Sequence, residues 1–123
     1  MVMSTATVLR HFESHCEDEF QYLAEHAPLR LLHLVQTGLR ARPDLLTFAA
    51  EAMARIAHTP LAVMALLPLL HSEHAIVREG AVYGLMPHLR HSMEARTALR
   101  DLAGRDASPG VRSAAEDALA NLD

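Results

Sequence analysis

The stretches VREGAVYGL (residues 77–85) and VRSAAEDAL (residues 111–119) repeat one pattern, with starting points 34 residues apart. Each opens with Val-Arg, has an alanine four positions after the valine and a leucine four positions after that. The apolar positions are Val77, Ala81 and Leu85 in the first copy and Val111, Ala115 and Leu119 in the second. This spacing places the side chains along one stripe of a helix, and the small central alanine lets a neighbouring helix approach closely. We therefore expect two equivalent helices whose stripes are buried between stacked neighbours.

A third, divergent copy precedes these two. Its apolar residues are Leu45, Ala49, Met53 and Ile56. It starts 32 residues before Val77, and Leu46 stands where the later copies have arginine. An apolar segment with helical spacing also comes before each copy, at residues 29–39, 60–70 and 94–104. The repeating unit is therefore a helical pair, and such pairs must stack because one pair alone cannot bury its stripe.

These patterns divide the chain into an N-terminal helix and three helical pairs. The expected segments are 1–27 for the N-terminal helix and 28–58, 59–91 and 92–123 for the pairs, all in one domain that covers residues 1–123. Within them we expect helices at 5–26, 29–40 and 44–58, and further helices starting near residues 59, 77, 92 and 109. The fold class predicted from this organisation is all-α.

Several residues mark where these helices begin, end or bend. Serine or threonine at an N-cap accepts a backbone hydrogen bond, and proline is tolerated in the first turn. The expected caps are Ser4, Thr59 before Pro60, Ser92, and Ser108 before Pro109. Gly104 suits a left-handed position at a helix end. Pro68 and Pro87 fall inside expected helices, where each removes a backbone hydrogen bond and should produce a kink.

The composition is that of a small globular protein rather than of a disordered or membrane-spanning chain. Half of the 123 residues are apolar, and leucine and alanine dominate. The formal charge of −4 disfavours non-specific binding to nucleic acid, which requires a basic field. All basic residues are arginine, a usage that suggests a bacterial genome. Cys16 is the only cysteine and no signal peptide is evident, so we expect a cytoplasmic protein.

Two segments carry a resemblance to a known family. The stretches LLPLLHSEHAIVREGAVYGL (66–85) and LRDLAGRDASPGVRSAAEDALANL (99–122) resemble HEAT repeats of the phycobilisome-lyase-like type. In that type a first helix is followed by a short polar turn, often with aspartate, and then by Val-Arg at the start of a second helix. Asp106 matches the turn position in the second stretch. The first stretch has His71-Ser72 there, so the resemblance does not carry an Asp–Arg ladder over to that repeat.

The resemblance implies a short right-handed α-solenoid of about three HEAT-like pairs behind the N-terminal helix. HEAT-like proteins are mostly scaffolds and adaptors, and a few are enzymes that flip bases or attach chromophores. A base-flipping relative would need a basic, aromatic-lined groove, but this chain is acidic and has no tryptophan. The similarity to lyases is one of repeat sequence, and it implies no lyase activity. The resemblance therefore favours a non-catalytic binding role.

One surface is the candidate site for a partner. In a HEAT-like stack the second helices of the pairs line the concave side, and residues two, six and ten positions after each repeat start point away from the buried stripe. These residues are Thr47, Glu51, Arg55, Glu79, Tyr83, Pro87, Ser113, Asp117 and Asn121. We call this set the concave ridge. Tyr83 is its best expected anchor. The alternative is an ordinary solvated helix face.

Nine histidines raise the question of a metal site. The closely spaced pairs are His11 with His15, His71 with His74, and His88 with His91. A zinc site generally needs three or four ligands, and the sequence has neither a second cysteine nor an HExxH pattern. We therefore expect no metal and no cofactor, and we interpret Cys16 as a core residue because it fits an apolar stripe.

Three functional interpretations remain open from the sequence. The first is a non-catalytic interaction module that binds a protein or peptide through the concave ridge. The second is an inhibitor, such as an immunity protein that neutralises a bacterial toxin enzyme. The third is a metal-binding protein built on the histidines. Nucleic acid and membrane are not expected partners, and a homodimer through a terminal repeat is expected because the ends of solenoids are apolar.

Overall fold

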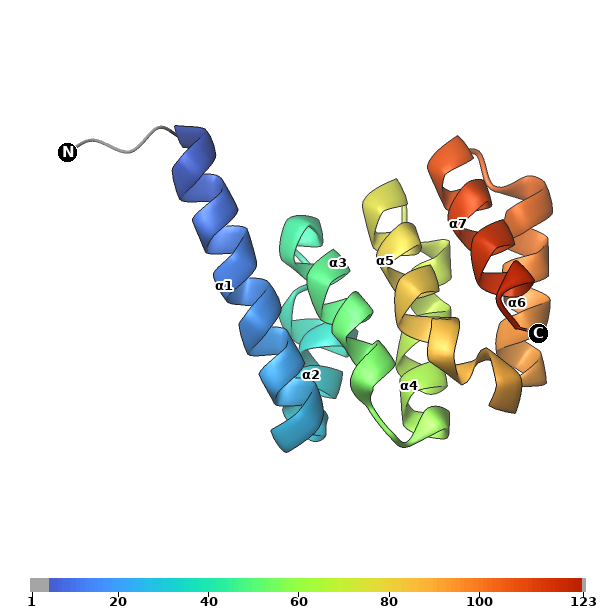
Figure 1. The fold of residues 1–123 in the computed structure, drawn as a ribbon, viewed down its shortest axis with the longest axis horizontal. Coiled ribbons are helices and arrows are strands. Elements are labelled where there is room, and N and C mark those ends of the chain that lie inside the picture. Colours follow the sequence, from blue (N-terminus) through green and yellow to red (C-terminus); the bar gives the residue numbers. More distant parts are fainter. Residues whose placement is uncertain (1–4, 123) are drawn as a thin grey trace.

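A computed structural model describes the backbone of residues 5–122 and the side chains from residue 16 to residue 122. Over these residues the chain is all-α and has no strand. The α-helices are α1 (Thr5–His26), α2 (Pro28–His33), α3 (Pro43–Ala52), α4 (Thr59–Leu66), α5 (Ala75–Leu85), α6 (Met93–Arg105) and α7 (Pro109–Ala120). Helices α1, α3, α5 and α7 form one row, and α2, α4 and α6 form the row behind it (Figure 1). This arrangement is the predicted α-solenoid, with α1 in front of three helical pairs.

The repeat stripes are buried as predicted. Val77, Ala81 and Leu85 are fully buried, as are Val111 and Ala115, while Leu119 is partly buried against the core. In the divergent copy Ala49, Met53 and Ile56 are buried as predicted, whereas Leu45 is only partly buried and its neighbour Leu46 is buried. The stack is therefore held together by equivalent faces of α3, α5 and α7.

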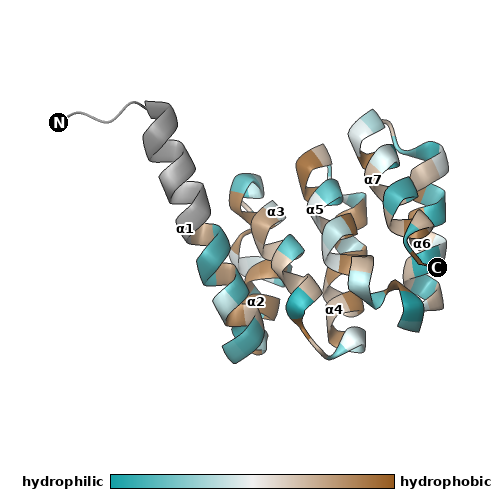
Figure 2. Ribbon diagram, in the orientation of Figure 1, coloured by the Kyte–Doolittle hydropathy of each residue, from teal (hydrophilic) through white to brown (hydrophobic). Residues whose placement is uncertain are grey.

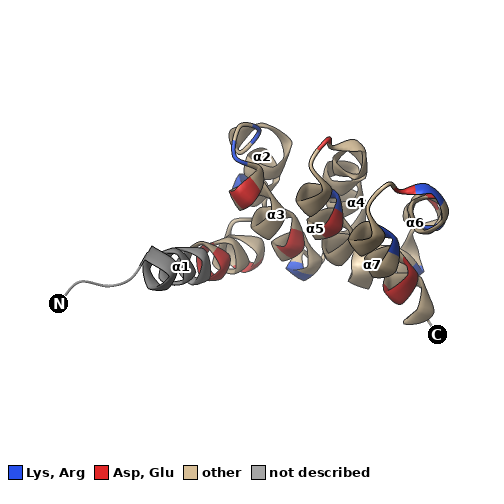
Figure 3. Ribbon diagram, turned by 90° about the horizontal axis from the view of Figure 1, so that it is seen from above, with Lys and Arg blue, Asp and Glu red and all other residues tan. Residues whose placement is uncertain are grey.

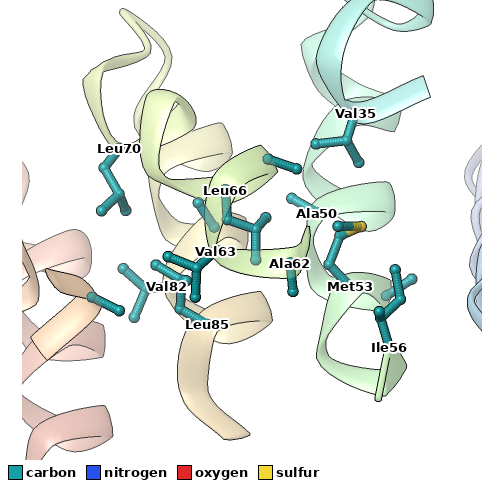
Figure 4. Close-up of a cluster of buried hydrophobic side chains, with 14 of the residues drawn as sticks. Val35, Ala50, Met53, Ile56, Ala62, Val63, Leu66, Leu70, Val82 and Leu85 are labelled. Carbon is teal, nitrogen blue, oxygen red and sulfur yellow. The ribbon is translucent and has the colours of Figure 1, made fainter. Parts of the chain in front are cut away.

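The core runs continuously through the pairs. Figure 4 shows Met53 of the first pair and Leu66, Val82 and Leu85 of the second among one cluster of apolar side chains. In the middle pair, α4 buries Ala62, Val63, Ala65 and Leu66. Helices α3 and α4 are also more hydrophobic than α6, as the brown colour in Figure 2 shows. Burial of this apolar surface drives the stacking.

Two glycines allow α5 to lie unusually close to α3. A Cβ atom on Gly84 would overlap the carbonyl oxygen of Ala50, and one on Gly80 would lie 2.6 Å from the carbonyl oxygen of Thr47. The hydroxyl of Thr47 donates a hydrogen bond of 2.7 Å to the carbonyl of Ile76, at the start of α5. The two helix backbones are therefore in direct contact, which no larger residue at either glycine position would permit.

The second and third pairs are joined by an ion pair. Arg78 on α5 donates Nε and Nη2 hydrogen bonds of 2.9 and 3.0 Å to the carboxylate of Asp106, which precedes α7. Both side chains are largely buried. The equivalent positions in the preceding repeats are Leu46 and Ser72, so this Asp–Arg link forms at one junction only among the described residues. The turn at His71-Ser72 has no aspartate and Leu46 is not an arginine, so this Asp–Arg link does not form at the first junction.

The turns that start α5 and α7 are nevertheless built alike. Ser72 Oγ accepts a hydrogen bond from the backbone N–H of His74, just as Asp106 Oδ1 accepts one from that of Ser108. In each repeat the arginine after the valine also donates to the carbonyl of the turn residue, Arg78 to Ser72 and Arg112 to Asp106. The 34-residue repeat is thus visible in individual hydrogen bonds.

His88 links the first two pairs from a buried position. It is 3% exposed, its Nε2 lies 3.1 Å from the carbonyl oxygen of Met53, and its Nδ1 lies 2.9 Å from the hydroxyl oxygen of Thr59. A carbonyl can only accept, so Nε2 donates to Met53, and Nδ1 forms the hydrogen bond with the Thr59 hydroxyl. Both ring nitrogens are therefore occupied in holding the fold.

The helix signals were partly right. Ser92 and Ser108 are N-caps, as predicted, and accept hydrogen bonds from the backbone N–H groups of Ala95 and Val111. Thr59 is not a cap: the cap of α4 is His58, whose ring accepts from the N–H of Leu61. Gly104 lies within α6, and no described glycine has a positive φ. The predicted cap Ser4 lies outside the described residues.

Several helices are shorter than predicted because their ends change geometry. The expected helix 29–40 is α2 followed by a π turn at Leu34–Gly38, and the expected helix 44–58 ends in a 3₁₀ turn at Met53–Arg55 before the extended residue Ile56. Pro68 and Pro87 were expected to kink the helices from inside, but the α-helices end at Leu66 and Leu85 and each proline lies at the start of the 3₁₀ segment that follows, Leu67–His71 and Met86–His91. A proline has no N–H, so the regular α-helical ladder is interrupted there.

The glycine contact yields a test of the packing. Gly84→Ala is expected to lower the free energy of unfolding by at least about 2 kcal/mol, because the added methyl group must push α5 away from the Ala50 carbonyl. Urea denaturation followed by circular dichroism measures this change. Gly104→Ala is the matched control: nothing lies within 4 Å of its added Cβ, so stability should be unchanged or rise by about 0.5 kcal/mol. Equal stability of wild type and Gly84→Ala would contradict the close contact.

The ion pair yields a test in acid. Burial alone raises the pKa of Asp106, but hydrogen bonds from Arg78 and from the Ser108 N–H, together with the charges of Arg78 and Arg112, outweigh burial and hold this pKa below its ordinary value. The group therefore stabilises the fold at pH values above the ordinary carboxyl pKa, and this contribution is lost as pH falls below about 4.

Asp106→Asn should cost about 2–4 kcal/mol at neutral pH, because Arg78 loses its charged partner in a largely buried position. Its stability should also fall less steeply than that of wild type in acid, as measured by urea midpoints from neutral pH to pH values below 4. Asp101→Asn is the control, since its ion pair with Arg105 is exposed and should be worth less than about 1 kcal/mol. Parallel acid profiles of wild type and Asp106→Asn would contradict the assignment.

Candidate partner-binding surface on the concave face

The row of helices that carries the concave ridge forms the inner side of the stack. Seen from above, α1, α3, α5 and α7 follow an arc, and α2, α4 and α6 lie outside it (Figure 3). All nine ridge residues lie on or directly after α3, α5 and α7. The exposed ones are Arg55, Tyr83, Pro87, Ser113, Asp117 and Asn121, and the half-buried ones are Thr47, Glu51 and Glu79. The ridge therefore exists as a surface, whereas its role in binding stays a prediction.

Tyr83 lies at the centre of an acidic group drawn from three helices. Its hydroxyl donates a hydrogen bond of 3.3 Å to Glu79 Oε1 on the same helix. Burial, the charge and hydrogen bond of Glu79, and the charges of Glu51 on α3 and Asp117 on α7 all raise the pKa of the Tyr83 phenol. These charges act on Tyr83 because the three helices bring them close to it, which the sequence spacing predicted.

Glu51 faces like charges on both sides. Its partial burial raises the pKa of the carboxyl, and the negative charges of Glu17 and Glu79 raise it further. Glu17 lies on α1 and is not part of the predicted ridge. Its contribution to the acidic surface could not be predicted from the repeats, because α1 lacks the Val-Arg start from which the ridge positions were counted. The available signal was the row of acidic residues at Glu17, Asp18 and Glu25 on this helix.

Two ridge residues have partners outside the ridge. Thr47 contacts α5 through the hydrogen bond and the glycine contact described above. Arg55 forms a 2.7 Å ion pair with Glu25 on α1, in which both side chains are about half exposed. The only arginine of the ridge is therefore already paired with α1. The remaining charge of the ridge is negative and comes from Glu51, Glu79 and Asp117.

A small apolar pocket lies at the far end of the ridge. Its volume is about 310 Å³. Its lining comprises Met86, Pro87, Arg90, Ala118, Asn121 and Leu122. Pro87 and Asn121 are ridge residues and lie four residues beyond Tyr83 and Asp117, respectively. The acidic group and the apolar pocket therefore form one continuous surface.

The histidines do not assemble into a metal site in the part of the chain that the structure describes. No group of three or more His, Cys, Asp or Glu side chains there is placed to hold a metal ion. His71 and His91 line the same groove of about 640 Å³ between α4 and α6, on the outer row, and His88 is committed to the hydrogen bonds given above. His11 and His15 precede the residues whose side chains are described. Cys16 is half-buried against the core.

The raised pKa of Glu51 yields a stability test. Because its folded pKa lies above the ordinary value of 4.5, the charged carboxylate destabilises the fold at neutral pH, and this cost is relieved as pH falls through the raised pKa. Glu51→Gln should therefore be slightly more stable than wild type near neutral pH, by less than about 1 kcal/mol, with the gain disappearing below the ordinary pKa. Thermal unfolding of wild type and Glu51→Gln, at neutral pH and at a pH below the ordinary pKa, measures this difference.

Glu116→Gln provides the control for Glu51→Gln. Glu116 is an exposed carboxylate on α7 outside the ridge, so its removal should leave the melting temperature nearly unchanged. A Glu51→Gln protein that is less stable than wild type at neutral pH would show that the charge is favourably paired.

Comparison with known proteins gives one match. A family model described as HEAT repeats matches residues 31–120, which covers all three helical pairs except for the first three residues of α2 and the last residues of the chain. No curated protein and no solved structure matches the chain significantly. Among the described residues, none of the helices combines the length and the apolar character that a bilayer crossing requires.

Proposed function

The chain belongs to the HEAT-repeat family, and we propose on this basis that it is a non-catalytic adaptor that binds a protein or peptide partner through the concave ridge. HEAT repeats generally mediate interactions between proteins. The observation that carries the proposal is the position of Tyr83, which is 38% exposed, hydrogen-bonds to Glu79 and experiences the charges of Glu51 on α3 and Asp117 on α7. A rigid aromatic side chain with a polar tip is a typical anchor of protein interfaces.

The electrostatics of the ridge support a partner with positive charge. Glu51, Glu79 and Asp117 act on the same phenol, and Glu51 remains on this surface although it lies beside like charges. A cationic group from a partner would remove this repulsion and form charge-assisted hydrogen bonds. The attraction would be screened by salt, so binding is expected to weaken as ionic strength rises.

The finer parts of this proposal rest on the sequence. The Val-Arg starts of α5 and α7 and the Asp106 turn are the basis on which we assign the repeats to the phycobilisome-lyase-like type, and the single cysteine is the basis for a cytoplasmic location. The inhibitor interpretation uses the same surface. It differs in that its partner is an enzyme whose activity falls when the complex forms.

Paired variants of the ridge test the proposed function. Tyr83→Ala and Glu79→Arg should each reduce capture of partner proteins from a lysate of the source organism by about tenfold or more, because an interface anchor contributes at least about 1.4 kcal/mol. Quantitative mass spectrometry of proteins retained by the immobilised full chain measures this. Helical content and melting temperature should stay close to wild type, since Tyr83 is exposed, Glu79 is only half-buried and neither belongs to the apolar core.

Glu116→Arg is the matched control. It makes the same charge change as Glu79→Arg on an exposed helix position outside the ridge. If it reduced capture as much as Glu79→Arg does, the effect would come from net charge rather than from the ridge. If all the variants retained the same partners as wild type, the concave ridge would not be the binding surface.

A further inference from the structure

The pocket at the end of the ridge has the size of a single side-chain site. Its volume of about 310 Å³ lies at the lower limit for small-molecule pockets, which span roughly 300–1,000 Å³. Ala118 is buried, and Met86 and Leu122 are partly buried against the core, so the walls are apolar and fixed by packing. Pro87 and Asn121 are exposed and form part of the rim. The pocket is therefore suited to one aliphatic side chain presented from outside.

Charged groups flank this pocket on two sides. Tyr83 and Asp117 lie four residues before Pro87 and Asn121, which belong to the 3₁₀ segment after α5 and to the turn after α7. Arg90 lines the pocket itself and is exposed. The pocket thus has an acidic group before it and a basic side chain in its own lining.

We propose that this surface docks an extended peptide segment of a partner, with a cationic side chain on the acidic group around Tyr83 and an aliphatic side chain in the pocket. This inference rests on the proposed function, since it names the class of segment that the ridge recognises. In an extended chain the side chains of residues i and i+2 lie on one face, about 6.6 Å apart, so they are the nearest pair that can reach two neighbouring sites on this surface. The recognised segment has arginine or lysine two positions from leucine, methionine or valine.

Charge complementarity determines the occupant. Glu79 and Asp117 together with Glu51 favour the cationic group, and Arg90 disfavours a second cation on the other side of the anchor. The pocket alone would accept many apolar side chains, because an apolar pocket distinguishes methylene groups by only about 1–3 kcal/mol. Specificity therefore comes from the charge beside the anchor.

A random-peptide display library tests this inference. When the library is panned over the immobilised full chain, the enriched peptides should share a basic residue two positions from an aliphatic residue, and should not have basic residues on both sides of it. A synthetic, fluorescently labelled peptide with the enriched consensus should bind with a dissociation constant that fluorescence polarisation can measure. An enriched consensus without a basic residue, or no consensus at all, would overturn the proposal.

Variants of the pocket and the ridge separate this inference from the proposed function. Asn121→Trp, which fills the exposed rim, should weaken binding of the consensus peptide about tenfold, and Asp117→Asn should weaken it several-fold. Glu116→Gln, beside Asp117 but outside the ridge, should leave binding unchanged. Circular dichroism of each variant confirms that the fold is retained.

The outcomes can be told apart. If Tyr83→Ala weakens peptide binding but Asn121→Trp does not, the ridge is the binding surface and the pocket is not an anchor site, which overturns this inference alone. If neither variant weakens binding, the peptide binds elsewhere, and both this inference and the proposed ridge fail. If Asn121→Trp and Asp117→Asn weaken binding while Glu116→Gln does not, the inference is supported.

Discussion

The direct contact of α5 with α3 is the constraint on which the rest of the structure depends. Because Gly80 and Gly84 have no side chains, the backbone of α5 rests against the carbonyl groups of Thr47 and Ala50. This contact fixes the distance between the first and second pairs and thereby the register of the buried stripes. The same closeness brings Glu51 on α3 to within electrostatic influence of Glu79 and Tyr83 on α5. The packing and the acidic surface thus have one geometric cause.

The core stabilises the fold, whereas the carboxylates of the concave ridge do not. The buried stripes stabilise the stack, whereas Glu51 and Glu79 stand half-buried near like charges. Residues that reduce stability are retained in proteins when they serve a function, and binding surfaces are common places for them. The positive charge of Arg55 is neutralised by Glu25 on α1, whereas the charges that act on Glu51 and Tyr83 are negative. This contrast within one face is the physical basis for assigning it a binding role.

The repeat stripes could be predicted from the sequence because their period is a property of the helix itself. Ser92 and Ser108 were identifiable as caps for the same reason, since an N-cap is a local signal. Thr59 and Gly104 were assigned wrongly: the His58 ring caps α4, the Thr59 hydroxyl instead hydrogen-bonds to His88 in the second half of the same helical pair, and α6 continues through Gly104 to Arg105. The ridge positions followed from counting along each repeat. Glu17 and the apolar pocket did not, because they depend on how non-equivalent segments meet in space.

The two junctions between the pairs use different interactions, and this gives the solenoid uneven mechanical properties. The first is held by backbone contact at glycine and by the hydrogen bonds of His88, and Leu46 occupies the place of the arginine. The second is held by the bidentate contact of Arg78 with Asp106. The glycine contact brings two helix backbones directly together, whereas the Arg78–Asp106 link runs through two side chains that can adjust when the helices rotate. A bending motion of the stack should therefore concentrate between α5 and α7, the two helices that enclose the terminal pocket.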